Sequence, residues 1–289
     1  MATCPRKRAG NERAMPADLN PTIALPRLAF VHIPKTAGTS ITSILRDCYG
    51  ALSLPAMTTL DYPFYSTEEL EKYRFYSGHA YLRDYQRLPH DTVRFTVLRD
   101  PTERALSFYH YCRTRDLSQT DDPFAREVIT LANEASAIEF FVSDLPMVVE
   151  HIRMGQLRQF LPEATLHAVG HRLTLPSELR TLATEQANAE LQQFDYVLTS
   201  ECLNLSFPLM ARALGLPRSC ARLNRENTSP DSIRNYCTYR HVITDLAAEG
   251  FEIYARFRRR EQNWIERMLE DPPNRRHPVL HEPEAARFS

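Results

Sequence analysis

The sequence predicts an α/β fold: a single domain with a central parallel sheet of four to five strands, flanked by helices. Three stretches place a short apolar β-prone run directly before a helical pattern, at residues 28–50, 93–111 and 194–214. Such strand-then-helix units favour parallel strands that are joined by crossover helices. The chain has 289 residues, of which 43% are hydrophobic, and this is enough for a large core.

The two ends of the chain differ from the part between them. Residues 1–26 are basic and lack periodicity, and residues 271–289 contain four prolines. We therefore expect a disordered arm and a disordered tail on either side of a domain at 27–270. No window approaches 18 consecutive apolar residues and no apolar signal sequence is visible, so we expect a cytoplasmic protein without a membrane span. The formal net charge of −1 gives no bulk attraction to nucleic acid.

The first unit, residues 28–50, has the architecture of an anion site. Apolar residues recur at helical spacing after residue 40, and the loop at 34–40 holds a lysine, a glycine and three hydroxyl residues. Unpaired backbone N–H groups and the helix dipole attract anions at such a helix N-terminus. Lys35 is one of only three lysines among 35 basic residues, and a compact ammonium fits a crowded phosphate cradle. The alternative is an ordinary turn with a solvated lysine.

This loop is not a Walker A motif, because Lys35 comes three residues before the only glycine of the loop. Residues 32–40 instead resemble the 5′-phosphosulfate loop of sulfotransferases. Within that family they look most like the heparan sulfate and uronyl 2-O-sulfotransferases and their bacterial relatives. The resemblance implies a sulfotransferase fold related to nucleotide kinases, with a largely helical insertion on the acceptor side.

The second unit, residues 93–111, repeats the pattern of a strand followed by a helix. Asp100, Pro101 and Glu103 suit the N-cap, N1 and N3 positions of the helix, so Arg99 ends the strand. Ser107 lies about two helical turns further on. Arg99 and Ser107 keep the interval of the family's 3′-phosphate site. The alternative is an arginine paired with Asp100 and a surface serine.

A third candidate is His79, which follows a β-prone run at 73–78. If that run is a parallel strand, His79 lies at the same sheet edge as the Lys35 loop. An imidazole suits general-base catalysis at neutral pH, and the placement of His79 resembles the catalytic histidine of the 2-O-sulfotransferases. The alternative is a structural histidine, in which case Asp84 or a histidine of the helical middle is the next candidate.

The rest of the chain is less specific. Residues 113–192 are predicted to be mostly helical and to form the acceptor cleft, and 240–269 to form one long helix. Residues 221–230 occupy the place of a family loop that closes over the nucleotide. The basic residues of the helical middle that could meet an anionic acceptor are His151, Arg153, Arg158, His167, His171 and Arg172.

Six cysteines show no zinc spacing and are interpreted as reduced core residues. No metal site is expected.

The function that the resemblance implies is transfer of a sulfuryl group from 3′-phosphoadenosine 5′-phosphosulfate (PAPS) to a hydroxyl acceptor, expected to be a saccharide. Lys35 and His79 would be the catalytic residues. The residues expected to bind the donor are Lys35, Thr36, Ala37, Gly38, Thr39, Ser40, Arg99, Ser107, Asn227, Thr228 and Ser229. Two alternatives stay open, namely an ATP-dependent small-molecule kinase and a non-catalytic nucleotide-binding or scaffold protein.

Overall fold

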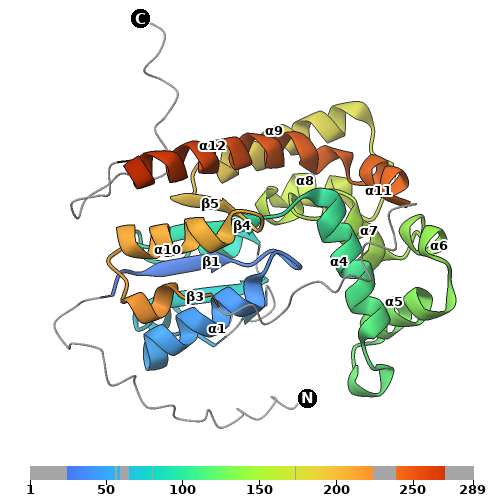
Figure 1. Ribbon diagram of the computed structural model, residues 1–289. Helices are drawn as coiled ribbons and strands as arrows, with labels where there is room; N and C mark the ends of the chain where they lie inside the picture. Colours follow the sequence, from blue (N-terminus) through green and yellow to red (C-terminus); the bar gives the residue numbers. More distant parts are fainter. Residues whose placement is uncertain are drawn as a thin grey trace, which may run out of the picture.

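The computed structural model describes residues 25–55, 57–58, 65–79, 81–172, 174–223 and 239–270. Its centre is a five-stranded sheet in the order β2-β3-β1-β4-β5, in which every neighbouring pair is parallel (Figure 1). The strands are β1 (Leu28–Val31), β2 (Met57–Thr58), β3 (Phe75–His79), β4 (Val93–Leu98) and β5 (Tyr196–Thr199). This arrangement confirms the predicted α/β class and the parallel sheet.

Helices connect and cover the strands. The α-helices are α1 (Gly38–Tyr49), α2 (Thr67–Glu71), α3 (Leu82–Tyr85), α4 (Pro101–Thr114), α5 (Pro123–Glu134), α6 (Ala137–Phe141), α7 (Pro146–Ile152), α8 (Glu163–Val169), α9 (Ser177–Leu191), α10 (Leu203–Ala213), α11 (Arg240–Leu246) and α12 (Phe251–Glu270). Short 3-10 turns are η1 (Gly50–Leu52), η3 (Leu117–Gln119), η4 (Arg158–Phe160), η5 (Arg218–Ala221) and η7 (Ala248–Gly250).

Both faces of the sheet are buried, as parallel sheets require. Leu28 and Phe30 of β1 pack into one core with α1 and α10, while Ala29 and Val31 pack into another with α8 and α9. Helix α12 contributes to both cores and lies beside α9 in Figure 1. Successive β1 side chains point to opposite faces of the sheet, so their apolar contacts pack helices against both faces.

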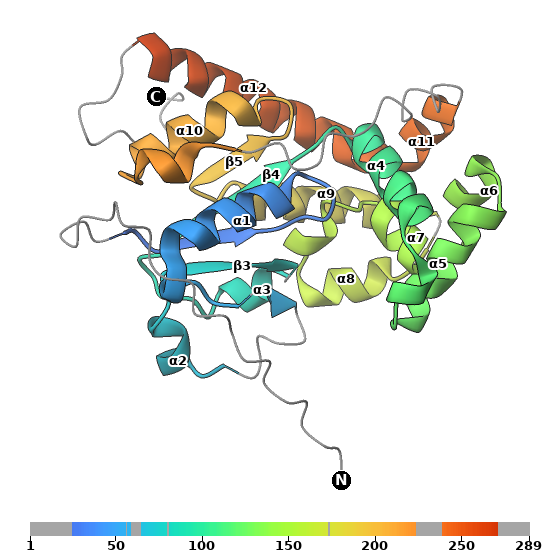
Figure 2. The same ribbon diagram turned by 60° about the horizontal axis from the view of Figure 1, so that its bottom comes forward.

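A third core lies beyond the carboxyl ends of the strands. It joins α4, α5, α6, α7 and α11, which Figures 1 and 2 both show grouped at one end of the molecule. The predicted helical middle at 113–192 is thus divided. Its first half packs with α4 in this separate bundle, whereas α8 and α9 cover the sheet.

The predicted long helix at 240–269 was wrong, because η7 interrupts it. At this turn Gly250 approaches the start of α4 so closely that a Cβ would lie 3.1 Å from Pro101 Cγ. Within the predicted helical middle, α7 ends at Ile152, because Met154 adopts a left-handed backbone with φ 52° that a right-handed helix excludes. The short strand β2 was not predicted.

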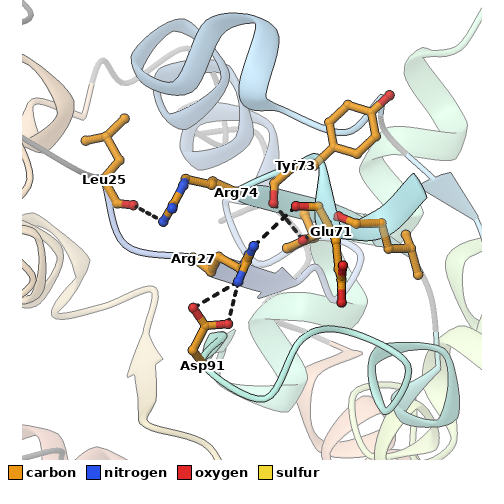
Figure 3. Close-up of polar contacts among 8 residues, drawn as sticks. Leu25, Arg27, Glu71, Tyr73, Arg74 and Asp91 are labelled. Atoms are coloured by element: carbon orange, nitrogen blue, oxygen red, sulfur yellow. Dashed lines mark hydrogen bonds and ion pairs between the residues drawn. The ribbon is translucent and has the colours of Figure 1, made fainter. Parts of the chain in front are cut away.

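At the amino ends of the strands, arginines tie the connecting segments together (Figure 3). Arg27, just before β1, forms an ion pair with Asp91 at 2.7 Å and donates to the Glu71 carbonyl at 3.2 Å. Arg74, just before β3, donates to the Leu25 carbonyl at 2.8 Å. These contacts occupy the edge opposite to the predicted site and hold the starts of β1, β3 and β4 in place.

Within the part of the chain that the structure describes, no helix has the length and apolar character needed to cross a membrane.

The interpretation of all six cysteines as reduced was wrong for two of them. Cys48 on α1 and Cys220 in η5 form a disulfide between positions 172 residues apart in the sequence. Cys112 and Cys202 are free thiols. The pairing escaped prediction because the helical stripe of α1 explains a buried Cys48 without any partner, and no local signal links it to Cys220.

Reduction of this disulfide should destabilise the fold. A cross-link that closes so long a loop removes conformational entropy from the unfolded chain, and we expect its loss to cost about 2–5 kcal/mol. Urea denaturation of the protein with and without a thiol reductant measures this. Cys48→Ala should lower stability and abolish the reductant effect, while Cys202→Ser, which leaves the disulfide intact, should retain it. An unfolding midpoint that ignores reductant would contradict the prediction.

Candidate active site

Three of the predicted site positions lie at the carboxyl ends of three adjacent strands. His79 ends β3, the Lys35 loop follows β1, and Arg99 follows β4, in the sheet order β3-β1-β4. Arg99 Nη1 donates a hydrogen bond to the Lys35 carbonyl oxygen at 3.2 Å. The two loops that the sequence separates by more than fifty residues are therefore in direct contact.

The loop after β1 has the backbone of an anion cradle. Lys35 and Ala37 both adopt left-handed conformations, with φ of 70° and 69°, and they flank the buried Thr36. Thr36 Oγ1 donates to the Ile33 carbonyl at 2.9 Å, so its hydroxyl holds the loop together. Ala37 is the N-cap of α1 and supplies no side-chain cap. Left-handed residues of this kind aim successive N–H groups into a concave nest that binds anions.

Gly38 allows His32 to pack against this loop. A Cβ at position 38 would lie 1.8 Å from His32 Cδ2 and Nε2, so a larger residue would displace the imidazole. His32 stacks on Phe30 of β1 with ring centroids 5.3 Å apart. Burial, together with the neighbouring His79 and Lys35, lowers the pKa of His32 to about 3. His32 is therefore a neutral packing residue that shapes the loop.

The side chain of Lys35 lies in a cationic and aromatic environment. Its Nζ sits 4.2 Å from the centre of the Tyr111 ring, and the Arg115 guanidinium carbon lies 4.9 Å from the same centre. Burial lowers the pKa of Lys35, and the positive charges of Arg99 and Arg115 lower it further. Three like charges at one edge repel one another, so an anion placed among them is stabilised.

The backbone of Arg99 is clamped from the helical side. Gln156 Oε1 accepts from the Arg99 N–H at 3.1 Å, and Gln156 Nε2 donates to the Arg99 carbonyl at 2.8 Å. Burial lowers the pKa of the Arg99 guanidinium, an effect that nearby carboxylates, led by Glu201, oppose. Ser107, on α4, is 9% exposed.

The start of α4 follows the predicted capping pattern in part. The Asp100 carboxylate accepts from the Glu103 N–H at 3.0 Å, and Pro101 occupies the first turn. The Glu103 side chain does not complete a capping box, because it pairs with Arg240 of α11 at 2.6 Å. This ion pair links α4 to α11 within the helical bundle.

His79 is exposed and oriented by a backbone carbonyl. Its Nδ1 lies 2.9 Å from the His32 carbonyl oxygen, and its ring packs against the His32 ring with centroids 4.2 Å apart. A carbonyl only accepts, so Nδ1 carries the proton and the lone pair of the neutral ring lies on Nε2. Although the residue is exposed as a whole, neighbouring protein atoms partly desolvate its imidazole, and this lowers the pKa of His79. The imidazole is thus neutral at physiological pH.

Several other predicted candidates make structural contacts. Asp84 Oδ2 accepts from the Tyr81 N–H at 2.9 Å and caps α3. Arg153 pairs with Glu249 at 3.0 Å, and Arg158 donates to the Gly170 carbonyl at 2.9 Å, so both guanidinium groups are buried in internal contacts.

The remaining predicted residues either lie in other parts of the structure or fall outside the residues that it describes. His171 Nε2 lies 2.7 Å from Glu150 Oε1, and His167 and Arg172 are exposed. Asn227, Thr228 and Ser229 fall outside the described residues.

Sequence reasoning missed several residues of the site. His32 and Tyr111 stood within the predicted units, but their apolar neighbours made them look like core residues. Gln156 holds Arg99, and Gln159 Nε2 donates to the His32 carbonyl at 3.2 Å. No local pattern indicates these two glutamines, because their partners lie 57 and 127 residues away in the sequence.

These features define an α/β protein with a cationic, donor-rich edge at the ends of three parallel strands. Residues 25–135 match the model of the sulfotransferase family. The match runs from β1 through α5 and contains the Lys35 loop, His79, Arg99 and Ser107. It supports the sulfotransferase family that the loops predicted, while the 2-O-sulfotransferase branch stays a prediction. A search of curated proteins finds no match.

The buried histidines of this region should make the protein sensitive to acid. The pKa values of His32 and His151 are lowered to about 3, mainly by burial. Below pH of about 6.5 the unfolded chain binds protons that the folded state excludes, so stability falls as pH decreases. We expect a loss of about 1.4 kcal/mol per pH unit for each histidine.

Urea denaturation between pH 7.5 and pH 5 measures this slope. His151→Gln should reduce the dependence of the unfolding free energy on pH by about 1.4 kcal/mol per pH unit, the contribution of one proton. His167→Gln, on the exposed face of α8, should not change this dependence. An unaltered slope in His151→Gln would show that this histidine does not remain neutral in the folded state.

Proposed function

We propose that the protein is a PAPS-dependent O-sulfotransferase that moves a sulfuryl group to a hydroxyl of a carbohydrate acceptor. The observation that carries the proposal is the contact between the Lys35 loop and Arg99, at one sheet edge and inside the segment that matches the family. Two anion-binding elements in contact suit a donor that carries phosphate groups at both its 5′ and 3′ positions.

The residues at this edge fit such a donor. The left-handed backbone at Lys35 and Ala37 and the N–H groups at the start of α1 favour the 5′-phosphosulfate. Thr36 would contribute through its backbone, because its hydroxyl is bonded to Ile33. Ala37, Gly38, Thr39 and Ser40 complete this loop. Arg99 and Ser107 would hold the 3′-phosphate, with Arg99 as the fork that binds phosphate oxygens.

Asn227, Thr228 and Ser229 remain proposed donor ligands on the strength of the resemblance alone.

The bound donor supplies an activated sulfuryl group with a phosphate leaving group. In-line transfer builds negative charge on the leaving oxygen, so a positioned cation lowers the barrier. Lys35 would provide this charge, and its lowered pKa reflects the burial that strengthens such an interaction. Its contact with Tyr111 holds the ammonium at the edge of the loop until an anion replaces the ring as partner.

His79 would take the proton from the acceptor hydroxyl. The His32 carbonyl fixes Nδ1–H, so Nε2 is the nitrogen that accepts the proton. A neutral imidazole is the required form of a general base, and its lowered pKa keeps it neutral at pH 7. The exposed position of His79 would leave its imidazole accessible to an acceptor.

The acceptor would lie between this edge and the helical bundle. Arg153 and Arg158 are engaged in internal contacts, so we expect an acceptor that is recognised through hydroxyl groups and stacking more than through these two charges. The kinase and the scaffold remain the alternatives, and an assay with labelled PAPS and with ATP separates all three.

The first consequence concerns the nucleotide. Adenosine 3′,5′-bisphosphate should bind roughly tenfold to a hundredfold tighter than AMP, because a charge-assisted contact to the additional phosphate contributes about 1.5–3 kcal/mol. Calorimetry of both nucleotides measures the ratio. Arg99→Ala should reduce the ratio, whereas Arg126→Ala, on the exposed side of α5, should preserve it. Equal affinities in the parent protein would reject the assignment of Arg99 and Ser107.

The second consequence concerns the base. His79→Ala should keep nucleotide affinity and lower turnover by about 10²-fold or more, the usual contribution of a general base. The activity of the parent enzyme should fall as pH decreases through the lowered pKa of His79, below about 6.5, because the imidazole then holds a proton. The variant should lack this acid limb. Near-normal turnover of His79→Ala, with the acid limb intact, would assign the base elsewhere.

A further inference from the structure

A small cavity lies where α4 meets the turn after α7 and the start of α12. Its volume is about 10 Å³, and it is lined by Pro101, Arg104, Ile152, Met154, Gly155, Gln156, Ala247 and Gly250. This space suits one particle of the size of a water molecule or a monatomic anion, and it is too small for phosphate or sulfate. The cavity is separate from the Lys35 loop.

Arg104 is the charged residue among those that line this cavity. Its side chain is 1% exposed, and its Nη2 donates to the His151 carbonyl. Among the described residues, Nε and Nη1 are buried and have no hydrogen-bond partner. Buried polar groups almost always have partners, so two donors on one buried guanidinium call for a ligand.

Among the residues that the structure describes, no carboxylate forms an ion pair with Arg104 to balance its charge. Burial and repulsion from Arg99 lower its pKa to about 10, so the guanidinium is still charged at pH 7. His151 beside it is neutral, with a pKa lowered to about 3. Two carboxylates adjacent in sequence to residues of the cavity are engaged elsewhere: Glu103, next to Arg104, pairs with Arg240, and Glu249, next to Gly250, pairs with Arg153.

The walls of the cavity are built to enclose this guanidinium. Gly155 has no Cβ, and one placed there would lie 2.1 Å from Arg104 Nη2. Proline, isoleucine, methionine and alanine supply the other walls, which would shield a charge from water. A cation in such a place is costly without an anion, and a water molecule would satisfy one donor but would not balance the charge.

We propose that the cavity binds one halide ion, chloride under physiological conditions, which accepts a hydrogen bond from one of the two unpartnered Arg104 nitrogens, Nε or Nη1. The ion would supply the missing counter-charge where α4, the turn at 153–157 and η7 meet. Gln156 lines the same cavity and clamps the Arg99 backbone, so the halide would support the geometry of the neighbouring strand end. The proposal does not depend on the sulfotransferase activity.

Crystals of the full chain grown in sodium bromide test the site directly. Anomalous scattering at the bromine edge should give a peak within hydrogen-bonding distance of Arg104 Nε or Nη1. Density without anomalous signal would identify a water molecule and overturn the proposal, and so would an empty cavity.

Thermal unfolding provides a second readout in solution. For a dissociation constant on the order of 10 mM, 0.5 M bromide shifts the unfolding equilibrium about 50-fold, and the melting temperature should rise by about 3–5 °C relative to sodium gluconate of equal ionic strength. Ala247→Val, which fills the cavity, should abolish this difference. Lys35→Ala should retain it, because the anion cradle of that loop lies elsewhere. The same bromide response in parent and Ala247→Val would contradict the proposal.

Discussion

The parallel hydrogen-bond register of β3, β1 and β4 is the constraint on which the candidate site depends. Val31, the last residue of β1, lies opposite Gly78 of β3 and Thr96 of β4, so β3 and β4 extend only one and two residues further. That common edge brings His79, the Lys35 loop and Arg99 together from three distant parts of the sequence. Parallel pairing also requires helices on both faces, and the two sheet cores follow from it.

The opposite edges of the sheet serve different purposes. At the amino ends, Arg27 and Arg74 bond to carbonyls and to Asp91, and these arginines have protein partners. At the carboxyl ends, cations gather around the Tyr111 ring and against a backbone of left-handed residues. The two ends of the sheet therefore differ: the arginines at the amino ends have carbonyl and carboxylate partners, whereas cations lie close together at the carboxyl ends, where the anionic donor that we propose would bind.

Much of this arrangement could be predicted from the sequence, and the failures have physical reasons. The strand-to-helix units at β1 and β4 can be predicted from the spacing of their apolar residues, from capping residues and from the composition of their loops, all of which are local properties of the sequence. The Cys48–Cys220 disulfide, the break at Met154 and the clamp by Gln156 depend on contacts between distant segments, and local patterns carry no record of them. The disulfide is also more typical of an oxidising compartment, so it weighs against the cytoplasmic location expected from the sequence.

Helix α12 has a consequence for how the chain folds during its synthesis. Its first half places Tyr254 and Phe257 in the core on one face of the sheet, and its second half places Trp264 and Met268 in the core on the other. Neither core can close on a ribosome until these last residues have left the exit tunnel. The nascent chain therefore carries two incompletely covered apolar sheet faces until α12 has emerged, and it would depend most on chaperones during this interval.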